Sequence, residues 1–180
     1  MQTIKKIPVL FVTGNPGKLR EFTAITGHLL DTEQLDIDLP ELQGTPEEVA
    51  AEKCKLAFKE CGRPLITEDT SLCFNAYGGL PGVYIKWFLK TLKPEGLHKM
   101  ACAFDDQTAY AQCIFSYMES ADKPPIQFVG RCHGSIVYPR GENQFGWDPC
   151  FQPDSGKETF SEMDADLKNS ISHRANALKK

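Results

Sequence analysis

The first apolar positions of the chain form an uninterrupted run. Residues 8–13 (PVLFVT) are largely apolar, β-branched or aromatic, and four turn formers follow at residues 14–17. Such a run with a turn behind it predicts a buried strand and a tight loop. The next apolar residues recur at helical spacing and predict a helix over residues 18–29: Leu19, Phe22, Ile25 and Leu29. A strand, a glycine loop and a helix in this order are typical of an α/β fold with a largely buried sheet.

A strong helix start follows at Thr45. This residue can cap the helix, Pro46 suits the first helical position, and Glu48 completes a capping box. The helix is predicted to run to about Cys61 with one apolar face, made of Val49, Ala50, Cys54, Ala57, Phe58 and Cys61. Lys53 lies at the edge of this face. Its ammonium group either extends to solvent or is held toward a site.

The rest of the chain divides into short elements without a repeat or a linker. A strand over 64–67 runs into Glu68 and Asp69, so both carboxylates are predicted at a strand end. The other predicted elements are strands at 35–39, 71–75, 108–118 and 126–137 (the last two a hairpin), helices at 84–92 and 94–103, a glycine-rich loop at 78–82 and a polar loop at 139–148.

The C-terminal segment carries Lys168, Ser172, His173 and Arg174. On one straight helix Lys168 and Arg174 would lie about 120° apart and could not easily reach one ligand. We therefore expect Ser172 to cap a helix with His173 and Arg174 in its first turn, and Lys168 to lie in the preceding loop. Such a cap would also aim free backbone N–H groups at the same place.

Length, composition and charge are those of a soluble globular protein. Of the 180 residues 41% are hydrophobic and 24% are charged, which argues against disorder, collagen and coiled coil and predicts one domain over residues 1–180. No apolar run reaches the roughly 18 residues of a membrane helix. The N-terminus, Met1 to Pro8, has two lysines but too short an apolar stretch for a signal peptide. The net charge of −4 provides no basic footprint for nucleic acid.

The cysteines number seven, and no two are closer than seven residues. Disulfide frameworks use even numbers of cysteines, and zinc sites use closely spaced pairs. The pattern therefore predicts reduced thiols in a cytoplasmic protein.

The segment after the first strand has the parts of a phosphate cradle: Thr13, Gly14, Asn15, Pro16, Gly17 and Lys18. Its glycines let the backbone approach an anion, the helix N-terminus offers unpaired N–H groups, and Lys18 adds a cation. Only two residues separate Gly14 from Gly17-Lys18, whereas the longer P-loop has four. On these residues alone, a phosphate loop and a plain strand-to-helix turn fit equally well.

Three carboxylates follow predicted strands: Glu41, Glu68 and Asp69. In open α/β sheets, ligand sites lie beyond the carboxyl ends of strands. Carboxylate oxygens suit Mg²⁺, which keeps waters and substrate phosphates in its shell. The alternative is three solvated acids near turns.

Two aromatic residues lie in the polar loop, within Phe145-Gly146-Trp147-Asp148. A nucleobase can stack on such a ring, or one of the rings packs in the core. His173 and Arg174 add donors, although each alone is more often a surface residue. Phosphate loop, carboxylates and aromatic rings together predict a nucleoside triphosphate as the ligand.

Five motifs occur in order between Val9 and Leu178: Thr13-Gly14-Asn15-x-x-Lys18, Glu68-Asp69-Thr70, Gly78-Gly79-Leu80-Pro81-Gly82, Phe145-Gly146-Trp147-Asp148-Pro149 and Ser172-His173-Arg174. With these motifs the chain resembles the inosine triphosphate pyrophosphatase family, which acts on non-canonical purine nucleoside triphosphates. Residues 84–88 and 93–97 are most similar to the eukaryotic branch.

The resemblance implies a long mixed twisted β-sheet flanked by helices, two lobes with a central active-site cleft, and a homodimer. It implies Mg-dependent hydrolysis of ITP, dITP and XTP between the α- and β-phosphates, which cleanses the nucleotide pool; Mn²⁺ could replace Mg²⁺. Glu41 and Asp69 match the metal positions of the family. Its nucleotide-binding positions match Thr13, Gly14, Asn15, Pro16, Gly17, Lys18, Lys53, Asp69, Thr70, Lys86, Phe145, Gly146, Trp147, Asp148, Lys168, His173 and Arg174.

The hypothesis for catalysis follows from these residues. Mg²⁺ on Glu41 and Asp69, with Glu68 as a further ligand, would orient a water toward the α-phosphorus, and Asp69 or Glu68 would accept its proton. The cations expected to offset the phosphate charge are Lys18, Lys53 and Lys86.

Specificity is expected from donors to the 6-oxo group of the base. Arg174, His173 and backbone N–H groups would be left facing a second donor if adenine were bound. How guanine, which also has a 6-oxo group, is rejected stays open. Two other classes also stay open: a non-catalytic nucleotide sensor, against which the carboxylates argue, and a hydrolase for another nucleotide or a small phosphoester.

Overall fold

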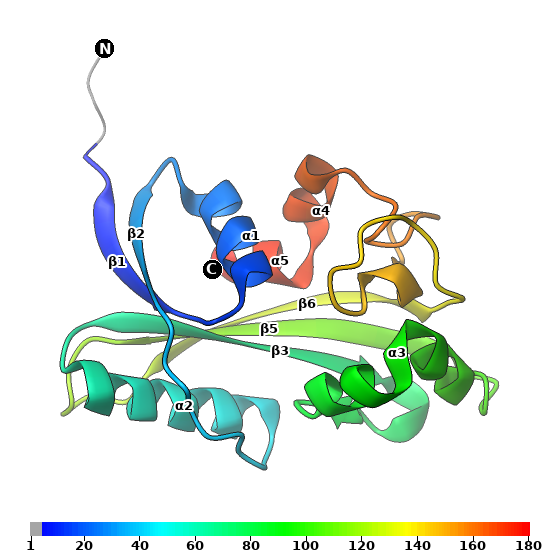
Figure 1. The fold of residues 1–180 in the computed structure, drawn as a ribbon, viewed down its shortest axis with the longest axis horizontal. Helices are drawn as coiled ribbons and strands as arrows, with labels where there is room; N and C mark the ends of the chain where they lie inside the picture. The colour runs from blue at the N-terminus through cyan, green and yellow to red at the C-terminus, as the bar shows by residue number, and fades with distance from the viewer. Residues whose placement is uncertain (1–4) are drawn as a thin grey trace.

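A seven-stranded mixed sheet forms the frame of the molecule. The computed structural model describes residues 5–180, so the prediction for Met1 to Pro8 lies partly outside the described residues. Figure 1 shows that the long strands of this sheet run the length of the protein. Strand order is β2-β1-β3-β5-β6-β7, with β4 beside β3. The strands are β1 (Ile7–Val12), β2 (Leu30–Leu35), β3 (Leu65–Phe74), β4 (Pro81–Gly82), β5 (Thr108–Met118), β6 (Ile126–Ile136) and β7 (Phe151–Pro153).

Both parallel pairings lie at the N-terminal edge of the sheet. Strand β1 is parallel to β2 and to β3. The pairings of β3 with β4 and β5, and of β6 with β5 and β7, are antiparallel. The expected fold class, a long mixed sheet flanked by helices, is confirmed.

The helices cover both faces of the long strands. In Figure 1, α2 and α3 lie below the strands, and α1, α4 and α5 lie above them. Their bounds are α1 (Pro16–Thr26), α2 (Pro46–Cys61), α3 (Ile85–Ala101), α4 (Ala165–Ile171) and α5 (His173–Leu178), with 3₁₀ turns at Asn75–Tyr77 and Asp148–Cys150.

The core is divided in a way that defines two lobes. One cluster, around Phe151 and Phe160, packs beside α3 at the far end of the long strands. Two others lie on opposite faces of the sheet near β1: one joins Leu10 to Cys54 of α2, and one joins Phe11 to Phe22 of α1. The long strands β3 and β5 pass through both ends and hold the lobes together.

Strand β3 continues beyond the end that the sequence predicts. It forms one ten-residue strand, because β5 pairs with it over its whole length. Glu68 and Asp69 therefore lie in mid-strand, and their predicted place at a strand end is wrong. The neighbouring β1 stops at Val12, which is paired with Thr67, so the two carboxylates lie just past the carboxyl end of β1.

The prediction of a strand at residues 35–39 is also wrong. Strand β2 ends at Leu35, the last residue that pairs with β1. Residues 36–45 then cross toward α2 without strand pairing, because the neighbouring β1 has already ended.

Local sequence signals place most helix ends correctly. The Thr45 capping box is present, and α2 ends at Gly62 in the left-handed conformation. Helix α1 spans Pro16–Thr26, so it starts earlier and ends earlier than predicted. Lys93, with φ 60°, breaks α3 ahead of Pro94, so the two predicted helical segments are both found.

The predicted cap at Ser172 is confirmed, because its side chain accepts the N–H of Ala175. Lys168 is not in a loop, however. It lies in α4, which the cap at Asp164 starts and the extended conformation of Ser172 ends. Two short helices at an angle replace the helix and loop that the sequence favours.

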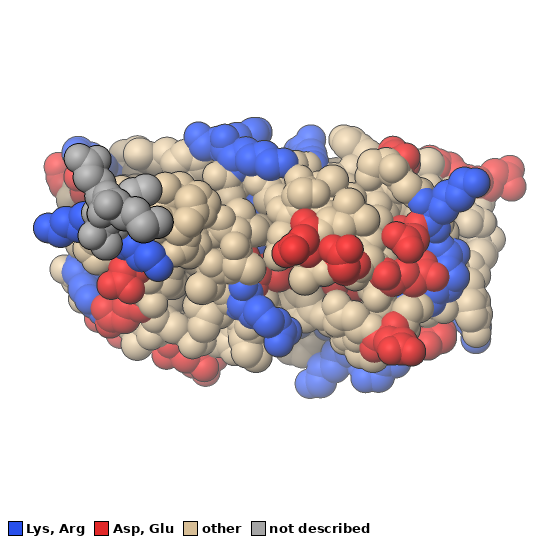
Figure 2. Space-filling view, turned by 90° about the horizontal axis from the view of Figure 1, so that it is seen from above, with Lys and Arg blue, Asp and Glu red and all other residues tan. Residues whose placement is uncertain are grey.

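The surface carries a group of acidic side chains, in agreement with the net charge of −4. Figure 2 shows acidic side chains gathered over the half of the upper face that carries α4 and the segment before it; the exposed acids there are Asp154, Glu158, Glu162, Asp164 and Asp166. The cysteines carry no disulfide. Within residues 5–180, no helix has the length and apolar character needed to span a membrane.

Candidate active site

A cavity of about 990 Å³ lies between the two lobes, within the size range of small-molecule sites. Its walls come from the β1–α1 loop, residues 36–41, α2, β3, α3, the 145–148 loop and α5. All predicted nucleotide positions line it except Lys168, which lies buried behind the wall. The predicted metal and catalytic residues Glu41, Glu68, Asp69 and Lys18 line it too.

The β1–α1 loop forms one wall, and its geometry corrects one expectation. The side chain of Asn15 caps α1 and accepts the N–H groups of Gly17 (2.9 Å) and Lys18 (3.2 Å). The sequence predicted that these two N–H groups would be unpaired. They are instead hydrogen-bonded within the loop, to the side chain of Asn15. The Thr13 hydroxyl in turn accepts the N–H of Asn15 at 3.1 Å. The loop is thus a pre-ordered turn that presents Lys18 to the cavity.

The two glycines of this loop allow close packing. A side chain at Gly14 would lie 2.3 Å from a carboxylate oxygen of Asp36, and one at Gly17 would lie 2.3 Å from the ring of Phe145. Because neither position has room for a Cβ atom, α1 can approach both the 36–41 segment and the 145–148 loop. The contact with Phe145 brings the two lobes together over the cavity.

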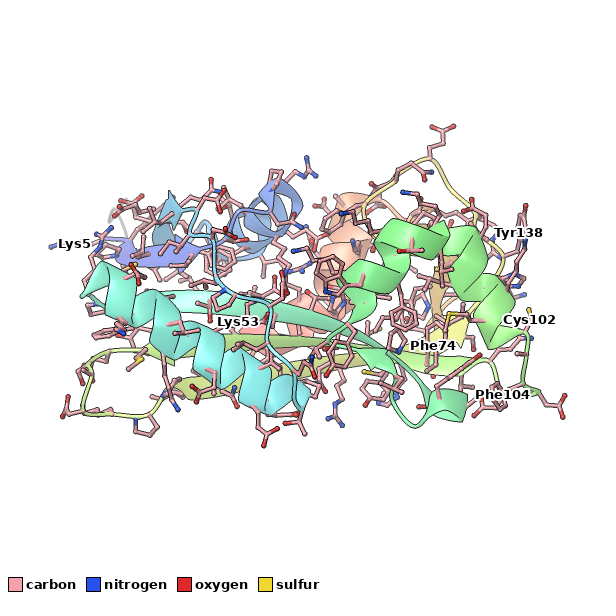
Figure 3. The ribbon with its side chains drawn as sticks, turned by 60° about the horizontal axis from the view of Figure 1, so that its bottom comes forward. Lys5, Lys53, Phe74, Cys102, Phe104 and Tyr138 are labelled. Atoms are coloured by element: carbon pink, nitrogen blue, oxygen red, sulfur yellow. The ribbon has the colours of Figure 1, made fainter. Side chains whose placement is uncertain are left out.

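Lys53 and Asp69 form an ion pair at the wall. Their Nζ and Oδ1 atoms are 2.7 Å apart and both side chains are partly buried, so Lys53 is held toward the site rather than extended to solvent. Figure 3 shows Lys53 on α2, where the segment from β2 to α2 passes. The second oxygen of Asp69, Oδ2, is buried without a hydrogen-bond partner. An unpaired buried carboxylate oxygen is costly, and a cation would satisfy it.

Glu41 lies at the more open side of the cavity. Its carboxylate is 2.5 Å from Nζ of Lys86, and both side chains are about half exposed or more. The hydrogen bond from Lys86, opposed by burial and aided by the charges of Lys53 and Lys18, lowers the pKa of Glu41. Among residues 5–180 there is no cluster of three or more His, Cys, Asp or Glu that could hold a metal.

Glu68 is buried in contact with two cations. Its carboxylate is 3.2 Å from Nη2 of Arg174 and 3.4 Å from Nζ of Lys18, and it accepts the Thr70 hydroxyl at 2.5 Å. Burial acts to raise the pKa of Glu68, but the charges of Arg174 and Lys18 outweigh it and hold this pKa well below the usual range. Glu68 is therefore ionised and its oxygens are already in use.

His173 and Arg174 are fully buried at the start of α5 and line the cavity. Burial, with the charges of Arg174 and Lys168, lowers the pKa of His173 well below its usual value, so its ring is neutral. Both ring nitrogens and Nε of Arg174 are buried without a partner. Such orphaned polar atoms are rare in folded proteins, and three of them on two residues that line the cavity favour a polar ligand here.

Gly130 of β6 sets how closely α5 approaches the sheet. A Cβ atom there would lie 2.1 Å from the backbone nitrogen of Ala177 and 2.3 Å from the carbonyl oxygen of His173. The absence of a side chain at this position lets the helix lie directly on β6, and this places His173 and Arg174 at the cavity.

The two aromatic residues of the 145–148 loop have different roles. Trp147 is 6% exposed and packs against Phe151, Phe160 and His173, so this ring belongs to the core. Phe145 is half-buried and lines the cavity. Only Phe145 is therefore free along one side for a stacked base.

Asp148 and Lys168 form a buried ion pair behind Phe145. Their side chains are 4% and 5% exposed, and Nζ of Lys168 lies 5.0 Å from the centre of the Phe145 ring. Burial, partly offset by Lys168, raises the pKa of Asp148 to about 6. Lys168 thus supports the wall from behind rather than lining it.

The sequence analysis missed some wall and support residues. Arg20, Asp36 and Asp38 line the cavity, and Glu21 bonds to both Lys168 and Arg174 from α1. Two signals could have found them. Glu21 lies three residues after Lys18 on the same helix, and Asp36 and Asp38 alternate with apolar residues.

Known proteins share this fold and most of its length. A family model described as the Ham1 family matches residues 9–180. A HAM1 protein from Coxiella burnetii superposes with a TM-score of 0.83 at 29% identity, over 96% of this chain and 95% of that one. The Staphylococcus aureus Ham1 protein gives 0.72 at 26%, over 96% and 94%.

A third structure shows the fold at lower identity. It is a nucleoside-triphosphatase and dITP/XTP pyrophosphatase from Mycobacterium abscessus, with a TM-score of 0.72 at 23% identity over 96% of each chain. The family resemblance predicted from the five motifs is thereby confirmed: the chain belongs to the Ham1 family.

Proposed function

We propose that the protein hydrolyses non-canonical purine nucleoside triphosphates, namely ITP, dITP and XTP, between the α- and β-phosphates. The observation that carries this proposal is the set of residues that line the cavity. We call Lys18, Lys53, Lys86, Glu41 and Asp69 the phosphate end, because they supply charges, and we call Phe145, His173 and Arg174 the base end, because they supply a ring and unpaired polar atoms. A nucleoside triphosphate combines the phosphates and the base that these two groups would bind. The related protein from Mycobacterium abscessus is named for dITP and XTP, which supports the same substrate class.

The phosphate end is built to hold negative charge. Lys18, Lys53 and Lys86 line it, and each of them now pairs with a carboxylate of the cavity wall. On binding of a triphosphate, these ammonium groups can turn to the phosphate oxygens. Positioned cations of this kind stabilise charge that develops on the departing pyrophosphate.

Mg²⁺ fits the donor set at this end. Glu41 and Asp69 supply hard oxygen ligands, and Oδ2 of Asp69 has no partner in the protein. We propose that these two residues hold the ion, with substrate phosphates completing its shell; Mn²⁺ has the same ligand preference. When bound, the metal supplies charge neutralisation at the phosphates and lowers the pKa of a water.

Asp69 is a better general base than Glu68. Both oxygens of Glu68 are occupied, by Thr70 and by Arg174 and Lys18, and its lowered pKa makes it a weak proton acceptor. Oδ2 of Asp69 is unpaired and is assigned to the metal, and Oδ1 becomes available as the base when Lys53 turns from it to the phosphates. We therefore assign proton acceptance to Asp69 and charge support to Glu68, with Lys18 placed between Glu68 and the phosphates.

The base end can distinguish a 6-oxo group from a 6-amino group. Nε of Arg174 is a donor without a partner, and neutral His173 can donate from one ring nitrogen. A 6-oxo group accepts from them, whereas the 6-amino group of adenine would leave them unpaired. Unpaired buried donors can support discrimination of about 10⁴-fold or more. Phe145 supplies the ring against which the base stacks.

The test is a panel of ITP, XTP, GTP, ATP, dUTP and dTTP with Mg²⁺, with phosphate and pyrophosphate measured separately. We expect ITP and XTP to give monophosphate and pyrophosphate, with ATP slower by about 10³-fold or more, and EDTA to stop the reaction. Release of orthophosphate instead, or equal rates for ATP and ITP, would contradict the proposal. Binding without turnover would indicate a nucleotide sensor.

The family resemblance also supports a homodimer in the cytoplasm. Size-exclusion chromatography with light scattering tests the first point, because a dimer has twice the chain mass of 20.1 kDa. A mass that stays at one chain across concentrations would contradict it. Fractionation of cells that express the protein tests the second.

A further inference from the structure

Six charged side chains of alternating sign form a continuous buried chain between the two ends of the cavity. Its order is Lys18, Glu68, Arg174, Glu21, Lys168 and Asp148. The exposed fractions of these side chains fall between 0 and 19%. Three positive and three negative charges balance, as buried charges require.

Glu21 occupies the middle of this chain. One of its oxygens accepts from Nζ of Lys168 at 2.7 Å, and the other accepts from Nη1 of Arg174. These two partners lie 147 and 153 residues away in the sequence. Glu21 thus ties α1, which follows the phosphate loop, to both short C-terminal helices.

The contacts of Arg174 show what Glu21 does for it. One end of the guanidinium bonds to Glu21, and the other end, Nη2, bonds to Glu68 and Thr70 at 3.2 Å. Carboxylates on two sides fix the plane of the group. The remaining Nε is buried without a partner, and Arg174 lines the cavity, so Glu21 helps to fix the position of this group.

Lys168 is held in the same manner. Its ammonium group lies between Glu21 and Asp148, and it supports the Phe145 ring from a distance of 5.0 Å. Because one carboxylate bonds both cations, a shift of Arg174 moves Glu21 and with it Lys168. On the other side, Arg174 shares Glu68 with Lys18.

We propose that Glu21 is a positioning residue. It clamps Arg174, and through Arg174 and the shared carboxylate of Glu68 it keeps the phosphate-end cation Lys18 in place. This inference rests on the proposed function. A base that accepts a hydrogen bond from Arg174 leaves the chain of ion pairs intact, and Lys18 stays in place. A base that repels Arg174 displaces the chain, so discrimination appears in kcat and not only in binding.

The experiment compares wild type with Glu21→Gln and Glu21→Asp, using kcat and KM for ITP and for ATP. Gln has nearly the same shape but no charge, whereas Asp keeps the charge on a shorter side chain. For Glu21→Gln we expect kcat for ITP to fall by about 10²-fold, since a misplacement of 1 Å can have that effect. We expect KM to stay within about threefold, and the ITP/ATP ratio of kcat to fall by at least about tenfold.

The charge-retaining variant separates positioning from folding. We expect Glu21→Asp to recover kcat for ITP to within about tenfold of wild type, because it can still bond one of the two cations strongly. The matched control is Glu33→Gln, which removes a carboxylate from an exposed ion pair with Arg63. This variant should leave kcat for ITP and the ITP/ATP ratio of kcat unchanged. Circular dichroism and unfolding in urea establish that each variant is folded.

Two results overturn the inference. One is a folded Glu21→Gln enzyme with wild-type kcat and ITP/ATP ratio. The other, which applies if the Gln variant does not fold, is a folded Glu21→Asp enzyme whose kcat for ITP falls by more than about tenfold while its ITP/ATP ratio of kcat stays at the wild-type value. Failure of the proposed function is a different result, because wild type would then not release pyrophosphate from ITP.

Discussion

The two ends of the cavity hold their charges in opposite ways. At the base end, Arg174 and Glu21 form a pair whose side chains are 2% and 12% exposed. At the phosphate end, Lys86 and Glu41 form a pair whose side chains are 67% and 45% exposed. The first pair is fixed among buried partners, and the second can separate into solvent at little cost.

This difference matches the work proposed for each end. A base is recognised by donors that must not move, because a donor free to turn would serve adenine as well as hypoxanthine. Phosphates and a metal, in contrast, have to displace existing ion pairs, and weak exposed pairs exchange more readily than buried ones. We therefore expect changes at the base end to affect stability and specificity, and changes at the exposed rim to affect affinity alone.

The largest effect is expected at Asp69, in the phosphate end. Asp69→Asn removes the charge and the free oxygen that we assign to the metal and to proton acceptance, so turnover of ITP with Mg²⁺ should fall by about 10³-fold or more. Pyrophosphate release measures it. Asp31→Asn, an exposed residue of β2, is the control. Near-normal activity of the Asp69 variant would remove this residue from the mechanism.

The second largest effect is expected where α5 packs directly on β6, at Gly130. Gly130→Ala places a methyl group within 2.1 Å of the Ala177 backbone, so α5 must shift. We expect a loss of about 1–3 kcal/mol in the free energy of unfolding and about 10²-fold in kcat/KM for ITP. The control is Gly156→Ala, which meets nothing closer than 3.9 Å. Equal stability and activity of the two variants would show that α5 tolerates displacement.

A pH experiment tests the buried end through Asp148. Its folded pKa of about 6 lies above its ordinary value of 3.8, so the folded state binds this proton more tightly than the unfolded state. Its contribution to stability is therefore full below about pH 4 and is lost as the pH rises toward 6. The resulting loss is about 1–3 kcal/mol.

Asp148→Asn should lack this dependence. We expect the free energy of unfolding of wild type, measured relative to the variant in urea, to decrease between pH 4 and pH 6 and to stay level above pH 7. If the difference in the free energy of unfolding between wild type and variant were constant over this range, the pKa of Asp148 would not be raised by burial. Glu68, whose pKa is lowered, contributes with the opposite sign, but it is present in both proteins.

The smallest effect is expected at the exposed rim. Lys86→Gln removes a cation that pairs only with Glu41 among the described ion pairs. We expect KM for ITP to rise by about three- to tenfold, kcat to change little, and the free energy of unfolding to stay within about 0.5 kcal/mol. Kinetics and urea unfolding measure these values. A clear loss of stability would mean that the rim is as fixed as the base end.

Local signals predicted elements well and long-range geometry poorly. The cap at Thr45, the break before Pro94 and the cap at Ser172 were all predicted, because capping and turn formation depend on residues within about four positions. The end of β3 was misplaced, because β5 continues the strand through hydrogen bonds that no local pattern records. Lys168 lies in α4 and not in the predicted loop, because the extended conformation of Ser172 separates two short helices.

The sequence alone determined which residues could form a nucleotide site. Five motifs in order predicted many of the residues that line the cavity, because the chemistry of the side chains and the positions of the glycines can be read from the sequence. Only the tertiary structure decided which of these residues touch. Glu21 bonds to partners 147 and 153 residues away in the sequence. Trp147 packs in the core. Asp69, and not Glu68, has a carboxylate oxygen without a partner. Burial and pairing arise from contacts across the fold, and they determine which charges are fixed and which can move.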